Sequence, residues 1–257
     1  QTMSRYYEQY PRDYFDYVII DEAHHVGGQS YQKLLDYFTP KFLLGMTATP
    51  ERCDDFNIFD CFDGHVALEV RLREALEENL IVPFHYFGIR DIEGVNLSDV
   101  KLDQIHEITK RLKVNERVNF ILEQMQLFGY DGEYRKAIGF CVSVEHAEYM
   151  TQKFNEAGVV SACLTGNHSP EERQVIIQRL EDDQDPLEVI FTVDIFNEGV
   201  DIPSINLVLM LRPTQSPIIF IQQLGRGLRK QENKEFLTVL DFIGNHHKSF
   251  LTAIALN

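Results

Sequence analysis

Residues 17–24, Tyr-Val-Ile-Ile-Asp-Glu-Ala-His, join a short apolar run to two carboxylates and a histidine. An apolar run rich in β-branched residues predicts a fully buried strand, here ending at Asp21. Ligands of open α/β sheets bind outside the carboxyl ends of the strands. Asp21 and Glu22 therefore indicate a nucleotide site, in which Asp21 holds Mg2+ through water and Glu22 takes a proton from the attacking water. Taken alone, an Asp-Glu pair in this place is more often a solvated turn.

Three further stretches favour the nucleotide site. Residues 21–24 (DEAH) resemble motif II, the Walker B form of the DEAH-type helicases of superfamily two, and residues 47–49 (TAT) resemble motif III. Residues 191–203 (FTVDIFNEGVDIP) resemble motif V, and residues 222–229 (QQLGRGLR) match motif VI, Q-x-x-G-R-x-x-R. Since the four motifs follow in this order across almost the whole chain, the sequence is identified as a member of superfamily two. Its later motifs are most similar to bacterial helicase-like proteins related to restriction-enzyme motor subunits.

The resemblance implies an α/β fold with two RecA-like domains built on parallel sheets. The boundary is predicted near residue 83, where Pro83 ends a short helix and precedes a strand. Residues 1–83 then form the carboxyl-terminal part of RecA-like domain 1, with motifs II and III, and residues 84–257 form RecA-like domain 2, with motifs V and VI. In the second part strands alternate regularly with helices, which is typical of a parallel sheet covered on both faces. One long amphipathic helix is predicted between Ile105 and Met125, and a capping box predicts a helix from Pro170 to about Leu180.

No phosphate-binding loop of the Gly-x-Gly-Lys-Thr type occurs between residues 1 and 257. Such a loop cradles phosphates with backbone amides and reaches the terminal phosphates with a lysine. The close glycine pairs, Gly27-Gly28 and Gly225-x-Gly227, are not followed by Lys-Ser or Lys-Thr. We therefore expect a fragment whose first domain is truncated at its amino-terminal side, and which by itself hydrolyses ATP only at background rates.

The resemblance also implies roles for individual residues, with ATP and Mg2+ as cofactors bound between the two domains. The resemblance assigns the coupling between the domains to His24, Thr47 and Thr49. In motif V, Gly199 lets the backbone approach a ligand and Asp201 binds a ribose hydroxyl or orients an arginine. Thr192 precedes the position where many relatives carry a threonine, so no phosphate contact is expected from it.

Motif VI is predicted to lie on a helix that begins at Ser216-Pro217. At 100° per residue, Gln222, Arg226 and Arg229 cluster within about 60° of one another, and Leu228 faces the sheet. Arginines placed in this way can stabilise charge on the transferring phosphoryl group as arginine fingers, while Gln222 positions the water. The catalytic set is therefore predicted to be Glu22, Gln222, Arg226 and Arg229.

Composition limits the protein class. Of the 257 residues, 44% are hydrophobic, which is ordinary for a globular protein. No run approaches the roughly 18–20 apolar residues of a membrane span, and the first residues lack the apolar core of a signal peptide. We therefore expect a cytoplasmic protein without a membrane partner. The four cysteines are too widely spaced for a disulfide framework or a four-cysteine zinc site. A net charge of -16 repels phosphates on average, so contact with nucleic acid must be local.

The sequence therefore predicts an ATP-dependent nucleic-acid helicase or translocase motor, with DNA favoured over RNA as its partner. Two alternatives remain open. One is the motor part of a restriction or nuclease enzyme, with a cutting domain outside residues 1–257. The other is a nucleic-acid-binding module that has lost ATPase activity.

Overall fold

The computed structural model describes residues 3–47, 56–97, 99–101, 103–193, 202–213, 225 and 227–243. In chain order the elements are α1 (Met3–Tyr6), η1 (Tyr7–Gln9), β1 (Tyr17–Asp21), η2 (Ala23–His25), α2 (Gln29–Tyr37), β2 (Phe42–Met46), η3 (Ile58–Phe62), α3 (Leu72–Glu77), β3 (Phe84–Arg90), α4 (Ile105–Leu112), α5 (Asn115–Phe128), β4 (Ala137–Phe140), α6 (Val144–Glu156), β5 (Ser161–Leu164), α7 (Pro170–Glu181), β6 (Val189–Thr192), β7 (Leu207–Met210) and β8 (Leu237–Ile243).

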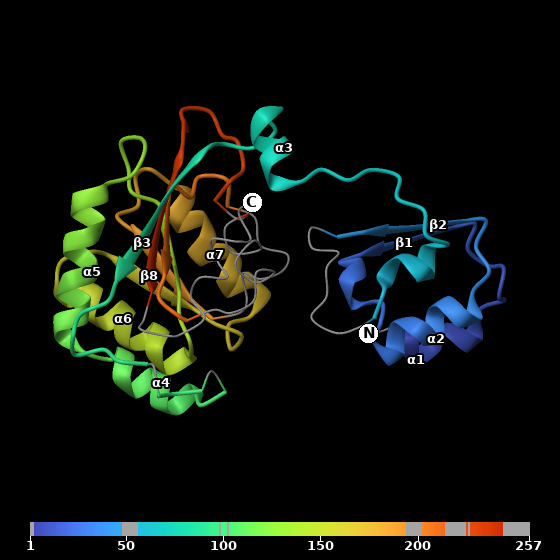
Figure 1. Ribbon diagram of the computed structural model, residues 1–257, viewed down its shortest axis with the longest axis horizontal. Coiled ribbons are helices and arrows are strands. Elements are labelled where there is room, and N and C mark those ends of the chain that lie inside the picture. The colour runs from blue at the N-terminus through green and yellow to red at the C-terminus, as the bar shows by residue number, and fades with distance from the viewer. Residues whose placement is uncertain are drawn as a thin grey trace. The chain divides into compact units, whose positions relative to one another are not determined.

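The chain divides into two compact units, which we call unit 1 (Gln1–Val70) and unit 2 (Arg71–Asn257) (Figure 1). This division comes earlier in the chain than the predicted boundary near residue 83. The reason lies in the segment that contains α3, because Leu72, Ile81 and Val82 pack against the hydrophobic core of unit 2. The segment between the two boundaries therefore belongs to unit 2.

Unit 1 contains a parallel pair of strands, β1 and β2. Ile20 of β1, Ala23 and Val26 of the following turn and Ile58 of η3 form its core. Tyr17 and Ile19 point to the opposite face of β1 and are 72% and 61% exposed. The prediction of a fully buried strand is therefore wrong for the described residues, because α2 and η3 cover only one face of this pair.

Unit 2 contains a parallel sheet, whose described strands number six, in the order β3-β8-β7-β4-β6-β5. β4 lies at its centre, where Ala137 is paired with Val189 of β6 and with Leu207 of β7. Both units are thus α/β with parallel strands, which confirms the predicted fold class.

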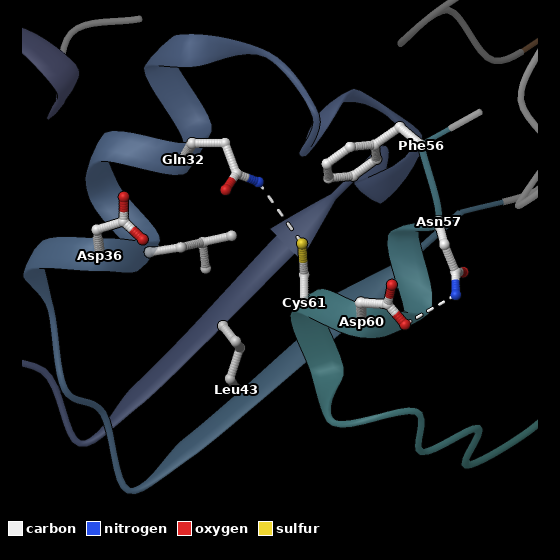
Figure 2. Close-up of a pocket in the computed structure, with 8 residues that line it drawn as sticks. Gln32, Asp36, Leu43, Phe56, Asn57, Asp60 and Cys61 are labelled. Atoms are coloured by element: carbon white, nitrogen blue, oxygen red, sulfur yellow. Dashed lines mark hydrogen bonds between the residues drawn. The ribbon is translucent and has the colours of Figure 1, made fainter. Parts of the chain in front are cut away.

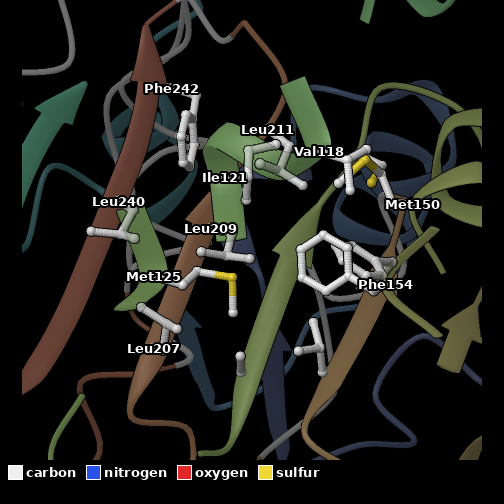
Figure 3. Close-up of a cluster of buried hydrophobic side chains, with 14 of the residues drawn as sticks. Val118, Ile121, Met125, Met150, Phe154, Leu207, Leu209, Leu211, Leu240 and Phe242 are labelled. Carbon is white, nitrogen blue, oxygen red and sulfur yellow. The ribbon is translucent and has the colours of Figure 1, made fainter. Parts of the chain in front are cut away.

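Helices cover both faces of the unit 2 sheet. On one face α5 and α6 bury Ile121, Met125, Met150 and Phe154 against strand residues such as Leu209 (Figure 3). On the other face α7 packs Ile177 and Leu180 against Ile138 and Ile190. Strands buried on both faces read as continuous apolar runs, which is why these strands are recognisable in the sequence.

Two local expectations have opposite outcomes. The capping box at the start of α7 is present, since Ser169 Oγ accepts the Glu172 N–H at 3.2 Å and Glu172 Oε2 accepts the Ser169 N–H at 2.7 Å. The single long helix between Ile105 and Met125 is wrong, because the chain breaks between α4 and α5. The break lets α4 bury Ile108 and Leu112 in a separate small cluster with Val95 and Leu97, while α5 packs on the sheet.

A buried carboxyl group makes the stability of unit 2 depend on pH. Burial raises the pKa of Asp241 on β8 to about 6, although the Tyr86 hydroxyl, which donates to Asp241 Oδ2 at 2.6 Å, opposes this shift. Because the pKa in the unfolded chain is about 3.9, the native state binds more protons in the interval between the two values. The free energy of unfolding should therefore fall as the pH rises from about 4 to above 6, by about 2–3 kcal/mol from this group.

We expect Asp241→Asn to remove this contribution to the pH slope. Urea unfolding at several pH values between 4 and 8 measures it as the difference between wild type and variant. Asp103→Asn, at an exposed position, is the control and should keep the wild-type slope. Equal slopes in Asp241→Asn and wild type would show that the buried carboxyl does not titrate in this range.

Candidate functional site

The carboxyl ends of β1 and β2 bring residues of motifs II and III to one edge of unit 1. Asp21 is paired with Met46, the last residue of β2, and Thr47 follows directly. Parallel strands end at the same edge, so the structure places Thr47 beside Asp21 and Glu22, as expected from the sequence. Thr49 lies outside the described residues.

Glu22 has a backbone conformation that is uncommon for its residue type. Its φ and ψ are both 51°, in the left-handed region, which costs a residue with a Cβ roughly 1–2 kcal/mol. The Glu22 N–H donates to Asp21 Oδ1 at 3.0 Å, and the Glu22 carbonyl accepts the His25 N–H at 2.9 Å. These bonds form the tight turn into η2 that holds the two carboxylates side by side at the strand end. Backbone strain of this kind is concentrated at functional sites, which supports a role for Glu22.

His24 joins the two motifs. Its Nδ1 lies 3.1 Å from Thr47 Oγ1 and 3.3 Å from Glu22 Oε2, and the ring is partly buried. The His24 and His25 rings lie 4.0 Å apart. The carboxylate of motif II is therefore linked through His24 to the hydroxyl of motif III within unit 1.

The oxygen atoms at this edge suit a magnesium ion that is shared with a nucleotide. Mg2+ is usually held by one or two carboxylates together with water and substrate phosphates. Asp21 presents an exposed carboxylate next to Glu22. Across the described ranges, no three His, Cys, Asp or Glu side chains gather into a metal site of their own. The Asp21 carboxylate can take one place around a Mg2+ whose other ligands are water and phosphate.

A pocket of about 590 Å3 opens elsewhere in unit 1, over α2, β2 and η3 (Figure 2). Its polar lining is partly engaged: Gln32 Nε2 donates to the Val26 carbonyl at 2.7 Å and to Cys61 Sγ at 3.5 Å, and Asn57 Nδ2 donates to Asp60 Oδ1 at 2.8 Å. Its lining residues are Gln32, Leu35, Asp36, Leu43, Phe56, Asn57, Asp60 and Cys61. None of the predicted site residues is among them, so the pocket is separate from the carboxylate edge.

The second group of predicted residues belongs to unit 2. Gly199, Asp201, Gln222 and Arg226 lie outside the described residues. Thr192 ends β6 and is fully buried.

Arg229 lies in a turn, and its predicted place on a helix is wrong. Residues 227–229 are not helical, while Leu228 is buried on the sheet as expected. A Cβ at position 227 would come within 2.7 Å of Leu237 Cδ1 and Cδ2, so the glycine lets the backbone pack directly on the start of β8. The Leu228 carbonyl then accepts the Val82 N–H at 2.9 Å, which holds the turn against the segment before β3.

Sequence reasoning missed a buried polar group at the carboxyl edge of the unit 2 sheet. Arg117 Nε of α5 donates to Asp91 Oδ2 at 2.8 Å, and the two side chains are 1% and 2% exposed. Arg117 Nη2 reaches the Leu211 carbonyl at 3.5 Å, and the guanidinium lies 5.9 Å from the Phe242 ring centre. An arginine on an amphipathic helix looks like a surface residue, and the sequence gives no signal of its burial.

His146 lies in the same region and is also fully buried. Burial, assisted by the positive charges of Arg117 and Lys113, lowers the pKa of His146 well below its usual value, so the ring is neutral near pH 7. Its Nδ1 accepts the Val142 N–H at 3.4 Å. This histidine supports the turn after β4 and is not a cation available to a phosphate.

Arg111 of α4 and Lys113, the residue that follows this helix, each pair with an acidic residue. Arg111 donates to Asp99 Oδ2 at 2.9 Å and to the Asn96 carbonyl at 2.6 Å, and Lys113 donates to Glu145 Oε1 at 2.6 Å. These two basic side chains are therefore already engaged by neighbouring groups of unit 2. No described helix is both long and apolar enough to cross a bilayer.

Comparison with known families matches two parts of the chain. Residues 104–231 match the family described as Helicase conserved C-terminal domain, and residues 1–52 match the family described as Type III restriction enzyme, res subunit. The two matches fall in units 2 and 1 respectively. The first match includes motifs V and VI, and the second includes motifs II and III.

Individual relatives agree with these families. IRC3 of Saccharomyces cerevisiae, which is named as an ATP-dependent helicase, is 29% identical over 95% of this chain and 36% of its own length. The DNA 3'-5' translocase XPB2 of Sulfurisphaera tokodaii is 24% identical over 87% of this chain and 58% of its own length. A fragment from Vibrio vulnificus YJ016, named as an HsdR subunit of a type I restriction enzyme, superposes with a TM-score of 0.77 at 24% identity, over 94% of this chain and 46% of that one. The chain thus spans between about a third and three fifths of the length of these proteins. These matches confirm the resemblance to superfamily two helicases and to restriction-enzyme motor subunits that the motifs predicted.

Proposed function

We propose that this chain is part of a nucleic-acid-dependent ATPase that moves along DNA. The observation that carries the proposal is the edge of unit 1, where Glu22, strained into the left-handed region, lies beside Asp21 and is linked through His24 to Thr47. This edge suits the binding of a nucleotide together with its metal ion, and the contact between His24 and Thr47 connects it to the end of the motif III strand. The helicase and translocase names of the relatives agree with it.

Each residue has a distinct task in this proposal. Glu22 accepts a proton from the water that attacks the terminal phosphate, and Asp21 holds Mg2+. When bound, Mg2+ would neutralise charge that develops on the phosphates. His24, hydrogen-bonded to Thr47, carries the state of the nucleotide site to the strand end, together with Thr49.

Motif VI completes the proposed chemistry. Arg226 and Arg229 stabilise negative charge on the transferring phosphoryl group, and Gln222 positions the water. In motif V, Gly199 allows close approach of the backbone and Asp201 binds a ribose hydroxyl or orients an arginine. In this proposal ATP is hydrolysed by residues of motif II together with those of motif VI.

The polymer is proposed to be DNA because a DNA translocase and a restriction-enzyme subunit are among the relatives. The net charge of -16 favours a few local phosphate contacts over a broad basic surface. A second candidate follows from the restriction family matched by residues 1–52: the chain would be the motor of an enzyme that cuts DNA with a separate domain.

The experiment that tests the proposal measures ATP hydrolysis by the natural full-length protein with single-stranded DNA, duplex DNA or RNA. We expect DNA to stimulate hydrolysis and RNA to do so more weakly. Thr47→Val should reduce this stimulation severalfold while ATP binding is retained, because it removes the hydroxyl that His24 contacts. Thr39→Val, at an exposed position in unit 1, is the control. A folded protein that contains a phosphate loop, binds DNA and never hydrolyses ATP would instead support the binding module.

A further inference from the structure

The side chain of Lys234 connects two segments that carry the predicted motifs of unit 2. Its ammonium donates to the carbonyls of Pro203 at 2.8 Å, Gly227 at 2.7 Å and Arg229 at 3.2 Å. An ammonium has three donors, and here three backbone carbonyls meet them. Pro203 is the last residue of motif V, while Gly227 and Arg229 belong to motif VI. One side chain therefore holds the ends of both motifs together.

The local sequence explains how Lys234 reaches this position. Residues 231–234 form a turn, in which the Lys234 N–H donates to the Gln231 carbonyl at 3.2 Å. Asn233 has a φ of 64°, and asparagine tolerates this left-handed conformation better than most residues. After the turn, the Glu235 N–H donates to Asp131 Oδ2 at 2.5 Å, which fixes the approach to β8.

The motif VI turn has little freedom to shift by itself. Gly227 packs so closely on Leu237 that even a Cβ would not fit, and the Leu228 carbonyl accepts the Val82 N–H. Lys234 binds the carbonyls on both sides of Leu228. The backbone from which the Arg229 side chain extends is thus fixed at its own carbonyl by the ammonium.

The environment of the ammonium ties this contact to pH. Burial lowers the pKa of Lys234 to about 8, and the carboxylate of Asp131, in the loop between α5 and β4, opposes the shift. Among the described residues around Lys234, Asp131 is the charged side chain that interacts electrostatically with the ammonium. The hydrogen-bond partners of the ammonium are the three backbone carbonyls. Above about pH 8 the amine is increasingly neutral and becomes a weaker donor to these carbonyls.

We propose that Lys234 is a positioning residue for the motif VI arginine Arg229, which it orients by binding the backbone of motifs V and VI at once. This inference rests on the proposed ATPase function for its consequence in catalysis. Lys234 does not contact the nucleotide; it acts through the backbone that carries Arg229. Loss of the ammonium should therefore lower kcat and leave the KM for ATP within about threefold, since a misplaced catalytic group costs about tenfold to a hundredfold in rate.

The test compares Lys234→Met with Lys230→Met, an exposed lysine of the same segment, and with Arg229→Ala. In the natural full-length protein we expect Lys234→Met to lower the DNA-stimulated kcat about tenfold or more and Lys230→Met to leave it unchanged. The wild-type kcat should decline above about pH 8, and Lys234→Arg, which stays protonated, should lose this decline. If Arg229→Ala is fully active, the proposed role of motif VI fails. If Arg229→Ala is inactive while Lys234→Met is active with the wild-type pH profile, the role of Lys234 is overturned.

A second measurement does not depend on activity. The Val82 amide, bonded to the Leu228 carbonyl, reports whether the motif VI turn stays in place. In the chain of residues 1–257, hydrogen exchange at Val82 should be at least about tenfold faster in Lys234→Met than in Lys230→Met, with exchange at Val239 in β8 unchanged. Equal protection of Val82 in both variants would overturn the inference. Should Lys234→Met not fold, hydrogen exchange at Val82 is measured in the wild type below and above pH 8 and corrected for the intrinsic pH dependence of exchange. Protection of Val82 that does not change between these pH values also overturns the inference.

Discussion

Replacing Glu22 with glutamine should lower the DNA-stimulated kcat for ATP hydrolysis by about 10²–10⁴-fold in the natural full-length protein. This is the range expected when a positioned general base is removed. Glutamine has nearly the same shape as glutamate, so the turn with its bond from the Glu22 N–H to Asp21 Oδ1 should persist. The amide cannot accept a proton from the attacking water. Hydrolysis should therefore fail after binding, with the dissociation constant for ATP changed only a few fold.

The measurement is steady-state hydrolysis at saturating DNA, paired with equilibrium binding of ATP. Glu8→Gln is the matched control, because it makes the same chemical change at an exposed site in unit 1, and it should behave as wild type. Loss of both binding and hydrolysis in Glu22→Gln would point to a collapsed turn. Full activity would remove Glu22 from the catalytic role and leave the strain at this residue without a functional explanation.

Much of the fold could be predicted because its information is local. The inner strands β4, β6 and β7 of unit 2 are nearly continuous apolar runs, and Ser169 with Glu172 marks the start of α7. The exposed face of β1 could not be predicted, because it depends on which elements pack against the strand. The break between α4 and α5 was missed for a similar reason: both helices are amphipathic, but they bury their apolar faces in different clusters.

The candidate site was predictable where topology alone brings residues together. His24 and Thr47 are 23 residues apart in sequence and meet because parallel strands end at one edge. Lys234 could not be found in this way, since its partners are backbone carbonyls, which any residue provides. Arg229 was expected on a helix because the motif VI pattern fits one, but Gly227 allows the chain to turn against β8.

The buried pair of Arg117 and Asp91 should give the largest stability effect in unit 2. Arg117→Met leaves Asp91 buried without its partner, and breaking such a pair from one side costs about 3–5 kcal/mol. Arg179 is the matched control: its Nε lies 2.9 Å from Asp185 Oδ2, but the arginine side chain is 44% exposed, so Arg179→Met should cost no more than about 1 kcal/mol. Urea unfolding, monitored by a probe in unit 2, measures both changes without the charge screening that guanidinium would add.

The double variant Arg117→Met with Asp91→Leu separates two quantities: the contribution of the intact pair to the free energy of unfolding, and the destabilisation caused by one buried charge without its partner. Because neither charge then remains buried, we expect the double variant to be at least as stable as wild type, and so more stable than Arg117→Met by about 3–5 kcal/mol or more. The guanidinium also approaches the Leu211 carbonyl, at the end of β7, so the double variant should still loosen that strand end. Recovery of stability together with faster amide exchange after Leu211 would show that the pair orders the carboxyl edge of the sheet more than it stabilises the fold. Equal effects of Arg117→Met and Arg179→Met would contradict a cost of leaving Asp91 buried without its partner, because burial is the main difference between the two ion pairs.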